Sequence, residues 1–394
     1  MSTNYNGDEV RKSTANTGKK KMSKKARQAK KRKMILIVEI VVVLILLLIL
    51  GLWMKFGRAT WDDTIDFDED IEVNDLDAET EALLDEYTTL ALFGVDNRSN
   101  GNYDSGNSDS MMIVSINNTT KEVNVVSVLR DTYLEVSDDT YRKCNYAYNH
   151  GGAEQAINML NKNLDLKISG YVAVDFYALA EVVDAIGGIE VTLTDSFCSA
   201  TNPETGGPAF AGYIAEVATV CGKDFDDLDP SYYTFTAGTY TLDGIQTVAY
   251  CRNRYGGGDD YSRTERQREV IKKIVEKVVT AKASTLNEII DDVLPDVATS
   301  LSASQVLALA TSAGDYTIES TGGFPFSLTT GTYGSKGSLV VPCTLVDNVT
   351  SLHKLLYNQD DYVPTSTVQS ISSQIQSDTS TTADSATVTQ DADE

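Results

Sequence analysis

One apolar segment constrains the architecture of this chain more than any other feature. Residues 34–54, MILIVEIVVVLILLLILGLWM, are apolar except for Glu39. A helix of this length is long enough to cross the hydrocarbon core of a bilayer. A cleaved signal peptide would have a shorter apolar region and a small-residue cleavage site. The segment therefore predicts an uncleaved transmembrane helix, and we interpret Glu39 as an acid tolerated near the inner interface.

The distribution of charge predicts how this helix is oriented. Residues 1–33 contain 12 Lys and Arg against two acids, whereas only Lys55 and Arg58 follow the apolar segment closely. The positive-inside rule therefore places the basic tail in the cytoplasm, against membrane lipid, and residues 55–394 outside the cell membrane. Those outer residues carry a net charge near −33. Because this region is so acidic, it lacks the basic surface that a nucleic-acid-binding domain needs, and we expect no nucleic acid partner.

Composition divides the outer part into three regions. Residues 55–86 are acidic without strong periodicity and predict a stalk or linker. Residues 87–363 contain the regular apolar patterns and predict the folded domain. Residues 364–394 are rich in Ser, Thr, Gln and Asp with few apolar residues, which predicts a disordered polar tail.

Within the folded domain, short apolar runs alternate with helical patterns. Strands are predicted at 88–95, 110–118 and 122–129, the last two as a hairpin, and again at 168–176 and 188–193. Helices are predicted from Gly152, over 177–188, over 242–250, from Ser262 and over 302–313. Residues 195–235 are predicted to form an irregular loop region. The alternation indicates an α/β fold with a sheet covered by helices on both faces.

The five cysteines permit at most two disulfides. Cys198 and Cys221 bracket a loop that contains glycine and proline, and they are the best candidates for a pair. Cys144 and Cys251 lie in apolar and aromatic runs and are expected in the core.

Polar residues that could carry chemistry gather at the ends of these predicted elements. Asp96 and Arg98 follow the first strand, Asp109 precedes the second, and Arg130 and Asp131 end the hairpin. A fourth block contains Arg252, Arg254, Arg263, Arg266 and Gln267. Ligands of open α/β sheets bind at strand ends, so these blocks can converge on one cleft. Each residue taken singly is also explained as a turn cap or an internal salt bridge.

Together, two acids and several arginines suit phosphoryl transfer, which needs positioning and charge neutralisation. Asp96 and Asp109 offer the oxygen ligands that Mg²⁺, or another divalent cation such as Mn²⁺, prefers. The sequence contains no Walker A loop and no G-x-S-x-G context for a serine nucleophile.

The order of these blocks resembles the LytR-CpsA-Psr family. The blocks are GVDNR, SDSMMIVSIN, EVNVVSVLRDTYLEV, KCNYAYNHGGAEQAI, VVDAIGGIEV, AYCRNRY and RTERQRE, within residues 88–282. The resemblance implies a mixed central β-sheet flanked by helices in a membrane-anchored enzyme, found mainly in Gram-positive bacteria. It also implies transfer of an anionic glycopolymer, such as teichoic acid or capsule, from a polyprenyl-pyrophosphate carrier to peptidoglycan.

Carried over to this sequence, the resemblance implies roles for single residues. Asp96 and Asp109 would associate with Mg²⁺. The residues that bind pyrophosphate would be Arg98, Arg130, Arg252, Arg254, Arg263 and Gln267, and the arginine pattern adds Arg266. Asp131 would accept a proton or orient Arg130. The polyprenyl chain would lie in an apolar groove lined by the faces of IVSI, VVSV and VVDAIGGIEV. Two alternatives stay open: hydrolysis of the same pyrophosphate by water, and a scaffold that binds the lipid-linked polymer without chemistry.

Overall fold

The computed structural model describes residues 60–96, 103, 106–256, 260–282, 285, 289, 293 and 296–390. They belong to one compact unit that runs from Phe56 to Glu394. Within these residues, no helix has the length and apolar character needed to span a bilayer. The predicted basic tail, the predicted transmembrane helix over 34–54 and Glu39 lie outside the described residues.

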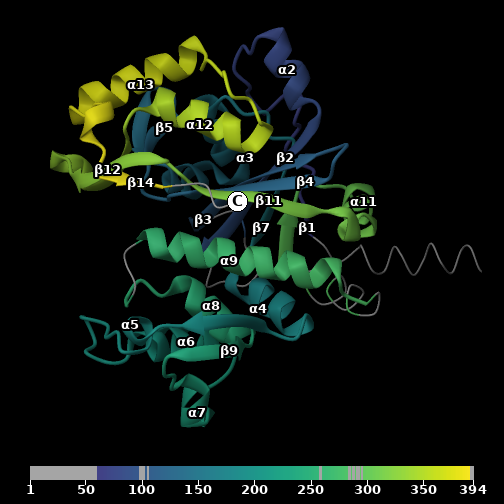
Figure 1. Cartoon of the computed structure of the whole chain (residues 1–394), viewed down its shortest axis with the longest axis vertical. Helices are drawn as coiled ribbons and strands as arrows, with labels where there is room; N and C mark the ends of the chain where they lie inside the picture. The colour runs from purple at the N-terminus through teal and green to yellow at the C-terminus, as the bar shows by residue number, and fades with distance from the viewer. Residues whose placement is uncertain are drawn as a thin grey trace, which may run out of the picture. The chain divides into compact units, whose positions relative to one another are not determined.

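A mixed seven-stranded sheet forms the centre of this unit (Figure 1). Its strands, in spatial order, are β1 (Thr60–Trp61), β10 (Val297–Thr299), β7 (Gly170–Val174), β2 (Tyr87–Asp96), β3 (Asn107–Asn117), β4 (Glu122–Val128) and β11 (Thr317–Phe324). Strand β2 runs antiparallel to β3 and parallel to β7, and β3 and β4 form the predicted hairpin. The mixed central sheet is thereby confirmed.

Helices cover both faces of the sheet, because side chains alternate along its strands. On one face, Phe93 and Ile113 share a core with α3 (Asn145–Leu164), α12 (Leu345–Tyr357) and α13 (Ser366–Thr379). On the other, Leu90 and Met112 face α9 (Asp260–Val279) and α11 (Ala303–Thr311). Helices α4 (Phe176–Ala185) and α8 (Gly244–Arg252) lie on the same side as α9 (Figure 1). The predicted helices at 177–188, 242–250, 302–313 and from Ser262 are thus confirmed.

In the described part of the chain, four helices and seven strands surround this sandwich. The helices are α2 (Ala78–Leu84), α5 (Asp195–Cys198), α6 (Ala209–Val220) and α7 (Pro230–Tyr233). The strands are β5 (Tyr133–Ser137), β6 (Thr140–Lys143), β8 (Ile189–Leu193), β9 (Gly238–Leu242), β12 (Ser327–Thr332), β13 (Ser338–Pro342) and β14 (Val388–Thr389). These strands form three small sheets: β5–β6, β8–β9 and β13–β12–β14. The predicted strand over 188–193 exists as β8, but it pairs with β9 and not with the central sheet.

The predicted irregular region over 195–235 is wrong in its middle. Residues 209–220 form α6, with Phe210, Ile214 and Val217 buried against a second hydrophobic cluster. Their spacing of four and three residues is that of one helical face. The helical spacing was missed because glycine and proline residues just before the helix are typical of a loop.

The predicted stalk is also wrong over the described part of residues 55–86. Strand β1 extends the edge of the central sheet beside β10, and Ile71 and Leu84 are buried in the main core. Helix α2 begins at Ala78, where the Asp77 carboxylate accepts hydrogen bonds from the N–H groups of Glu79 and Thr80. The acidic residues are therefore the exposed face of a packed segment.

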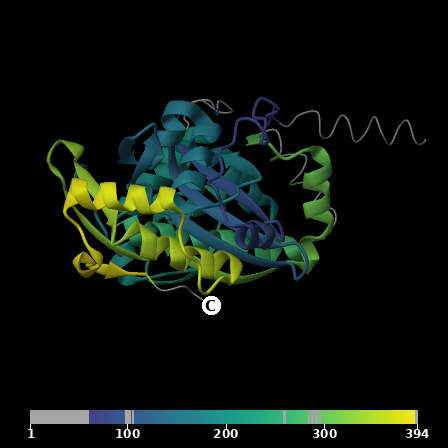
Figure 2. The ribbon, with the colours of Figure 1, turned by 90° about the horizontal axis from the view of Figure 1, so that it is seen from above.

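The C-terminal segment, predicted to be disordered, is folded as far as residue 390. Helix α13 lies beside α12 (Figures 1 and 2) and buries Val368, Ile371 and Ile375. Its start is held by the buried carboxylate of Asp165, which accepts hydrogen bonds from Thr365 N and Oγ1 at 2.8 and 2.7 Å. The segment has few apolar residues, but they fall on one helical face, and that placement suffices to dock it.

Both cysteines of the predicted disulfide are free thiols. The N–H of Ala209 donates to the carbonyl of Ala200, so α6 begins close to Cys198. Cys221 lies at the other end of α6, a helix about 18 Å long at 1.5 Å per residue. A disulfide needs Cα atoms within about 7 Å of each other, which this separation prevents. Cys144 and Cys251 are buried, as predicted.

Candidate active site

The site is built around Asp109, whose position depends on an irregularity in the sheet. In the β2–β3 ladder, Gly94 pairs with Ser110 and Val95 pairs with Ser108, which leaves Asp109 as an extra residue. Such a β-bulge bends the strand locally and re-aims the side chain of the unpaired residue. The Asp109 side chain is 25% exposed, so its carboxylate remains accessible at the end of the sheet.

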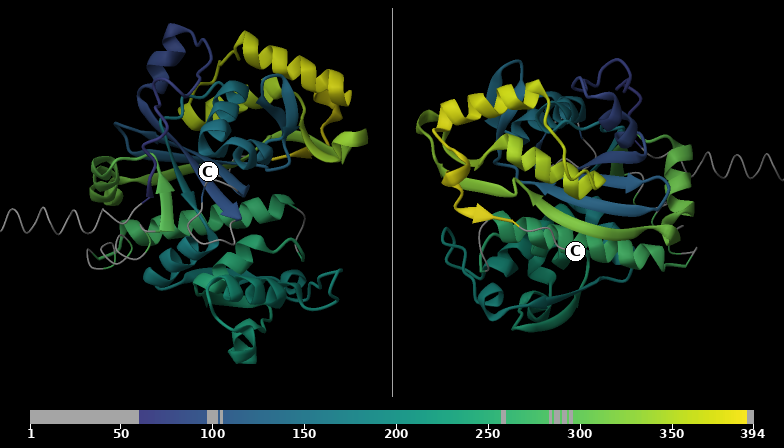
Figure 3. Two further views of the ribbon diagram at one scale, coloured as in Figure 1. Left: turned by 180° about the vertical axis from the view of Figure 1, so that it is seen from behind. Right: turned by 45° about the horizontal axis from the view of Figure 1, so that its top comes forward.

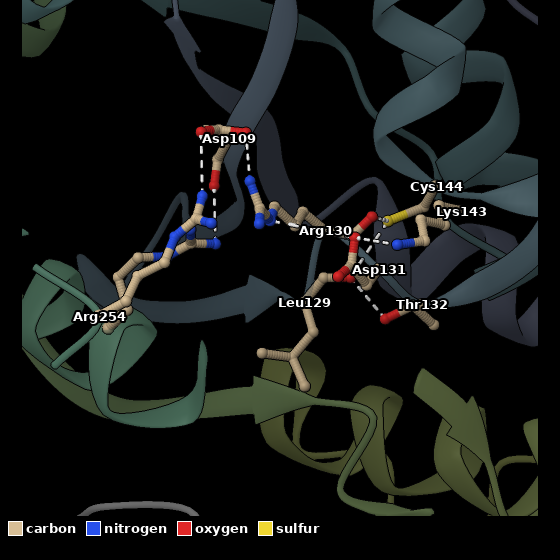
Figure 4. A network of polar contacts seen from close by, with 9 residues as sticks. Asp109, Leu129, Arg130, Asp131, Thr132, Lys143, Cys144 and Arg254 are labelled. Carbon is tan, nitrogen blue, oxygen red and sulfur yellow. Dashed lines mark hydrogen bonds and ion pairs between the residues drawn. The ribbon is translucent and has the colours of Figure 1, made fainter. Parts of the chain in front are cut away.

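Three arginines converge on this single carboxyl-bearing residue. Arg130 Nη1 lies 2.8 Å from Asp109 Oδ1, and Arg254 Nη2 lies 3.9 Å from Oδ2. Figure 4 shows the two guanidinium groups approaching Asp109 from different elements. Arg263 Nη2 donates a hydrogen bond of 3.5 Å to the backbone carbonyl of Asp109. Three guanidinium groups thus gather around Asp109 in a protein that is otherwise very acidic.

Buried hydrogen bonds from Thr132 and Cys144 fix the turn that carries Arg130. Cys144 Sγ lies 3.2 Å from the carbonyl oxygens of both Leu129 and Arg130, and Thr132 Oγ1 donates to the carbonyl of Leu129 at 2.6 Å (Figure 4). Burial raises the pKa of the Cys144 thiol, which therefore stays protonated and able to donate. These contacts hold the Arg130 backbone in one position.

Asp131 faces cations instead of the centre of the site. Its Oδ1 atom lies 3.2 Å from Lys143 Nζ and 4.0 Å from Arg130 Nε. Of the two predicted roles, these contacts fit the orientation of Arg130 better than the acceptance of a proton.

An apolar cavity of about 630 Å³ opens beside Asp109. Its apolar wall includes Leu92, Met112, Val174, Leu179, Ile271 and Ile274, which come from β2, β3, β7, α4 and α9. Polar residues at the same cavity are Asp109, Arg252, Arg254, Arg263 and Gln267. The cavity therefore combines an apolar interior with an arginine-rich mouth.

The predicted apolar groove is thus present but is lined largely by other residues. Val182 of VVDAIGGIEV contributes to the wall, whereas residues 113–116 and 125–128 do not. Ile113 and Val126 belong to the core on the opposite face of the sheet, because alternate residues of a strand point to opposite faces. A further part of the wall comes from α6, including Gly212 and Tyr213, which were predicted to lie in a loop.

Arg252 and Gln267 are held at the cavity by contacts of different kinds. Arg252 Nη2 lies 3.3 Å from Glu216 Oε2, and its guanidinium carbon lies 4.3 Å from the ring centre of Phe176. Gln267 Nε2 donates to the carbonyl of Cys251 at 3.4 Å. The buried Gln267 Oε1 accepts no hydrogen bond from any residue that the structure describes. This acceptor is therefore available to a ligand donor in the cavity.

Arg266, predicted to bind substrate, has a structural role instead. It does not line the cavity, and its Nε and Nη2 atoms donate to the backbone carbonyls of Tyr250 and Asn253. Burial lowers its pKa. Arg263 and Gln267 line the cavity and Arg266 does not, although residues three and four positions apart are neighbours on a helix. Neither the arginine count nor the helical spacing could therefore separate these positions.

The remaining predicted site residues are only partly placed. The backbone of Asp96 pairs with Asn107 at the end of β2, next to the bulge that carries Asp109. The Asp96 side chain and all of Arg98 lie outside the described residues. Among described side chains, no group of three or more His, Cys, Asp or Glu could hold a metal ion. The hard carboxylate oxygens of Asp109 nevertheless suit Mg²⁺, which commonly takes only one or two carboxylates together with substrate phosphates.

Two supporting residues were missed in the sequence, Lys143 beside Asp131 and Cys144 beneath Arg130. Both lie in the KCNYAYNHGG block, which was noted for its order but not for these contacts.

Comparison with known proteins gives a consistent picture. A family model described as the LytR_cpsA_psr family matches residues 55–325. One relative is TagU of Enterococcus faecalis, a polyisoprenyl-teichoic acid–peptidoglycan teichoic acid transferase. It is 32% identical to this chain over 190 residues, which are 48% of this chain and 52% of that protein. Biofilm regulatory protein A of Streptococcus mutans is 34% identical over 198 residues, 48% of this chain and 43% of that protein. The chain thus spans about half the length of the curated relatives it matches.

The fold is also similar to a solved structure. The crystal structure of protein gbs0355 from Streptococcus agalactiae superposes with a TM-score of 0.57 at 24% identity. The match covers 74% of this chain and 93% of that one. This likeness supports the fold.

Proposed function

Because the chain belongs to the LytR_cpsA_psr family, we propose that it transfers an anionic glycopolymer from a polyprenyl-pyrophosphate carrier to peptidoglycan during cell-wall assembly. The observation that carries the proposal is the cavity of about 630 Å³ with an apolar interior and an arginine-rich mouth. A polyprenyl pyrophosphate has the same division, with a long apolar chain joined to a highly charged head. The printed name of the Enterococcus faecalis relative, a teichoic acid transferase, supports the same class of reaction.

The mouth is suited to hold the pyrophosphate. Guanidinium groups bind phosphate oxygens through two parallel hydrogen bonds, and Arg254 and Arg263 both reach the cavity. In the described structure Arg130 and Arg254 are engaged by Asp109. A pyrophosphate carries more negative charge than one carboxylate, so we expect it to draw these guanidinium groups toward itself and free the Asp109 carboxylate.

The transfer step follows from this arrangement. A sugar hydroxyl of the acceptor attacks the phosphorus that bears the glycopolymer, a new phosphodiester bond forms, and the bridging P–O bond breaks to release polyprenyl monophosphate. The arginines stabilise the charge that develops on the phosphoryl oxygens. Asp109, once freed, is one of the described carboxylates at the cavity, and an oxygen of it that does not hold the cation can take the hydroxyl proton. Asp131 and Lys143 keep Arg130 aimed at the site.

A divalent cation, Mg²⁺ or Mn²⁺, forms part of the proposal. Asp109 and Asp96 would hold it together with the substrate phosphates, and it would supply further charge neutralisation at the pyrophosphate. We also propose that residues 34–54 anchor the chain in the cell membrane as a single-pass type II protein. Residues 55–394 then meet lipid carrier and peptidoglycan outside the cell.

The experiment is to incubate the full-length protein with a polyprenyl-pyrophosphate-linked oligosaccharide, Mg²⁺ and peptidoglycan oligomers, and to identify products by mass spectrometry. A phosphodiester-linked conjugate together with polyprenyl phosphate is the expected result. Release of sugar phosphate without conjugate would replace transfer by hydrolysis of the pyrophosphate. Lipid that binds but stays intact, with equal binding by a D96A/D109A double variant, would instead support a scaffold.

A further inference from the structure

The last part of the described chain packs against the segment that carries Arg130. Residues 326–390, which we call the C-terminal module, contain β12, β13, α12, α13 and β14 and follow the stretch matched by the family model, which ends at residue 325. Figures 1 and 3 show the helices of the module, coloured yellow-green and yellow, over one face of the central sheet. Strand β13 and helix α13 both contact β5, the strand that follows Arg130 in the chain.

The module supplies one of the hydrogen bonds that fix the backbone of the turn at residues 129–132. Val340 N, in β13, donates to the carbonyl of Asp131 at 3.0 Å. Leu129 N donates to the carbonyl of the last residue of β11 at 2.9 Å, and the start of α3 supplies two further N–H donors to the turn. The backbone that bears the Arg130 side chain is therefore held by three segments from other parts of the sequence, and the module is one of them.

Two charged side chains of the module also hold Tyr133, the first residue after this turn. The Tyr133 side chain is buried, and its hydroxyl donates to Asp378 Oδ2 at 2.6 Å. Lys336 Nζ donates to the Tyr133 hydroxyl at 2.6 Å and to Asp378 Oδ2 at 2.9 Å. Burial and the hydrogen bond to Asp378 raise the pKa of the Tyr133 hydroxyl, which therefore stays protonated and able to donate. Lys336 precedes β13 and Asp378 belongs to α13, so two elements of the module hold Tyr133 at once.

This network is close enough to the site to affect it. Tyr133 follows Arg130 by three residues, which span at most about 10 Å of extended chain. Tyr133 does not line the apolar cavity, so it reaches the site only through the turn. A guanidinium group displaced by about 1 Å can cost a reaction about 100-fold, because the transition state needs its partners in place.

We propose that the C-terminal module positions Arg130 for its substrate, with Tyr133 as the positioning residue through which Lys336 and Asp378 act. This inference rests on the proposed function, in which Arg130 binds the pyrophosphate. It adds a role for a part of the chain that lies beyond the family match.

The test is a double-mutant cycle on the full-length protein. Tyr133→Phe removes the hydroxyl and keeps the buried ring, and it is made alone and together with Arg130→Ala. Calorimetric titration measures binding of geranyl pyrophosphate, which has the charged head and only a short prenyl chain. Asp378→Asn, at a partly exposed side chain, weakens the same network without touching the buried ring. Thermal unfolding confirms that each variant folds.

Tyr362→Phe is the matched control. Tyr362 is also a buried tyrosine of the module, and its hydroxyl donates to Asp165 Oδ2 at 2.8 Å. Asp165 follows the end of α3, whereas the Arg130 turn is held at the start of that helix. Both substitutions remove one hydrogen bond between a phenol and a carboxylate, so a purely structural role of the module would make their effects on binding alike.

We expect Tyr133→Phe and Asp378→Asn to bind geranyl pyrophosphate about fivefold more weakly than the wild type, an effect within the range of couplings between neighbouring residues. Tyr362→Phe should bind it as the wild type does. In the Arg130→Ala background, Tyr133→Phe should weaken binding no further, because the side chain that it positions is already gone. In the transfer assay it should lower kcat/KM for the lipid donor and leave KM for the peptidoglycan acceptor unchanged. An equal loss in both backgrounds, or an equal loss in the control, would overturn the inference.

The same measurements separate this inference from the proposed function. If the wild type forms conjugate and Tyr133→Phe matches it in binding and in transfer, the positioning role is wrong and the function stands. If Tyr133→Phe weakens binding only when Arg130 is present but no conjugate ever forms, the positioning role stands and the proposed transfer is wrong. A wild type that does not bind geranyl pyrophosphate would overturn both.

Discussion

Arg254 and Arg266 belong to the same short arginine cluster but lie in opposite environments. The Arg254 side chain is 43% exposed, lines the apolar cavity and lies 3.9 Å from Asp109. Arg266 is 8% exposed and donates to the backbone carbonyls of Tyr250 and Asn253, with its guanidinium over the rings of Phe197 and Tyr250. One arginine is directed at a ligand and the other holds the chain together.

The difference shows how one cluster can serve both function and folding. Arg266 bonds the end of α8 and the turn that follows it, and this turn carries Arg254. The buried arginine thereby fixes the place from which the exposed arginine acts. If this interpretation is right, substitutions at the two positions should affect different measurements.

The largest effect is expected at the cavity mouth. Arg254→Ala should lower kcat/KM for transfer about 100- to 1,000-fold, the usual cost of removing one preorganised donor from a developing negative charge. Its free energy of unfolding should stay within about 0.5 kcal/mol of the wild type, since nearly half of the side chain is exposed and its ion pair with Asp109 is long, at 3.9 Å. Steady-state transfer kinetics and urea unfolding of the full-length protein measure the two quantities.

Arg142→Ala provides the control, because Arg142 is an exposed arginine that does not line the apolar cavity. It should leave transfer unchanged. A similar loss in both variants would mean that net charge, and not the position of Arg254, controls the reaction.

The second effect concerns stability. Arg266→Ala leaves two backbone carbonyls without their donor in a buried site, and it should lower the free energy of unfolding by about 2 to 3 kcal/mol. Urea unfolding of this variant beside Arg254→Ala measures the contrast directly. Equal stability of the two variants would remove the distinction drawn between the two arginines.

Much of this arrangement could be predicted from the sequence, and the failures have physical causes. Strands with unbroken apolar runs, such as β2, were placed correctly. The same is true of helices with a clear apolar stripe, such as α9. In both cases the apolar residues of the pattern are the residues that become buried. The bulge at Asp109 could not be foreseen, since it depends on the register between two strands. Helix α13 was missed because its stability comes from docking on α12 and on Asp165, partners that lie far away in the sequence.

The site shows the same limit. The blocks with Asp109, Arg130, Arg254 and Arg263 were expected to converge, and the structure brings them together. Arg266 was grouped with them because composition does not reveal which way a side chain faces. The wall from α6 was missed because its helix follows a stretch of glycine and proline that resembles a loop.

The smallest effect sharpens the comparison by changing the cavity interior while the arginine mouth stays intact. Gly212 lies in α6, lines the cavity, and has open space where a Cβ atom would stand. Gly212→Phe should place a ring in the apolar space and raise KM about tenfold for a donor with a long polyprenyl chain, the scale of one steric mismatch in an apolar pocket. A donor with a short chain should be used as well as by the wild type, since the mouth still binds its pyrophosphate.

Gly212→Ala is the matched control: alanine in a helix interior should stabilise the fold by about 0.5 to 1 kcal/mol without filling the cavity. An equal loss for long and short donors in Gly212→Phe would show that the substitution disturbs the mouth, and the apolar interior would then lose its assignment to the lipid chain.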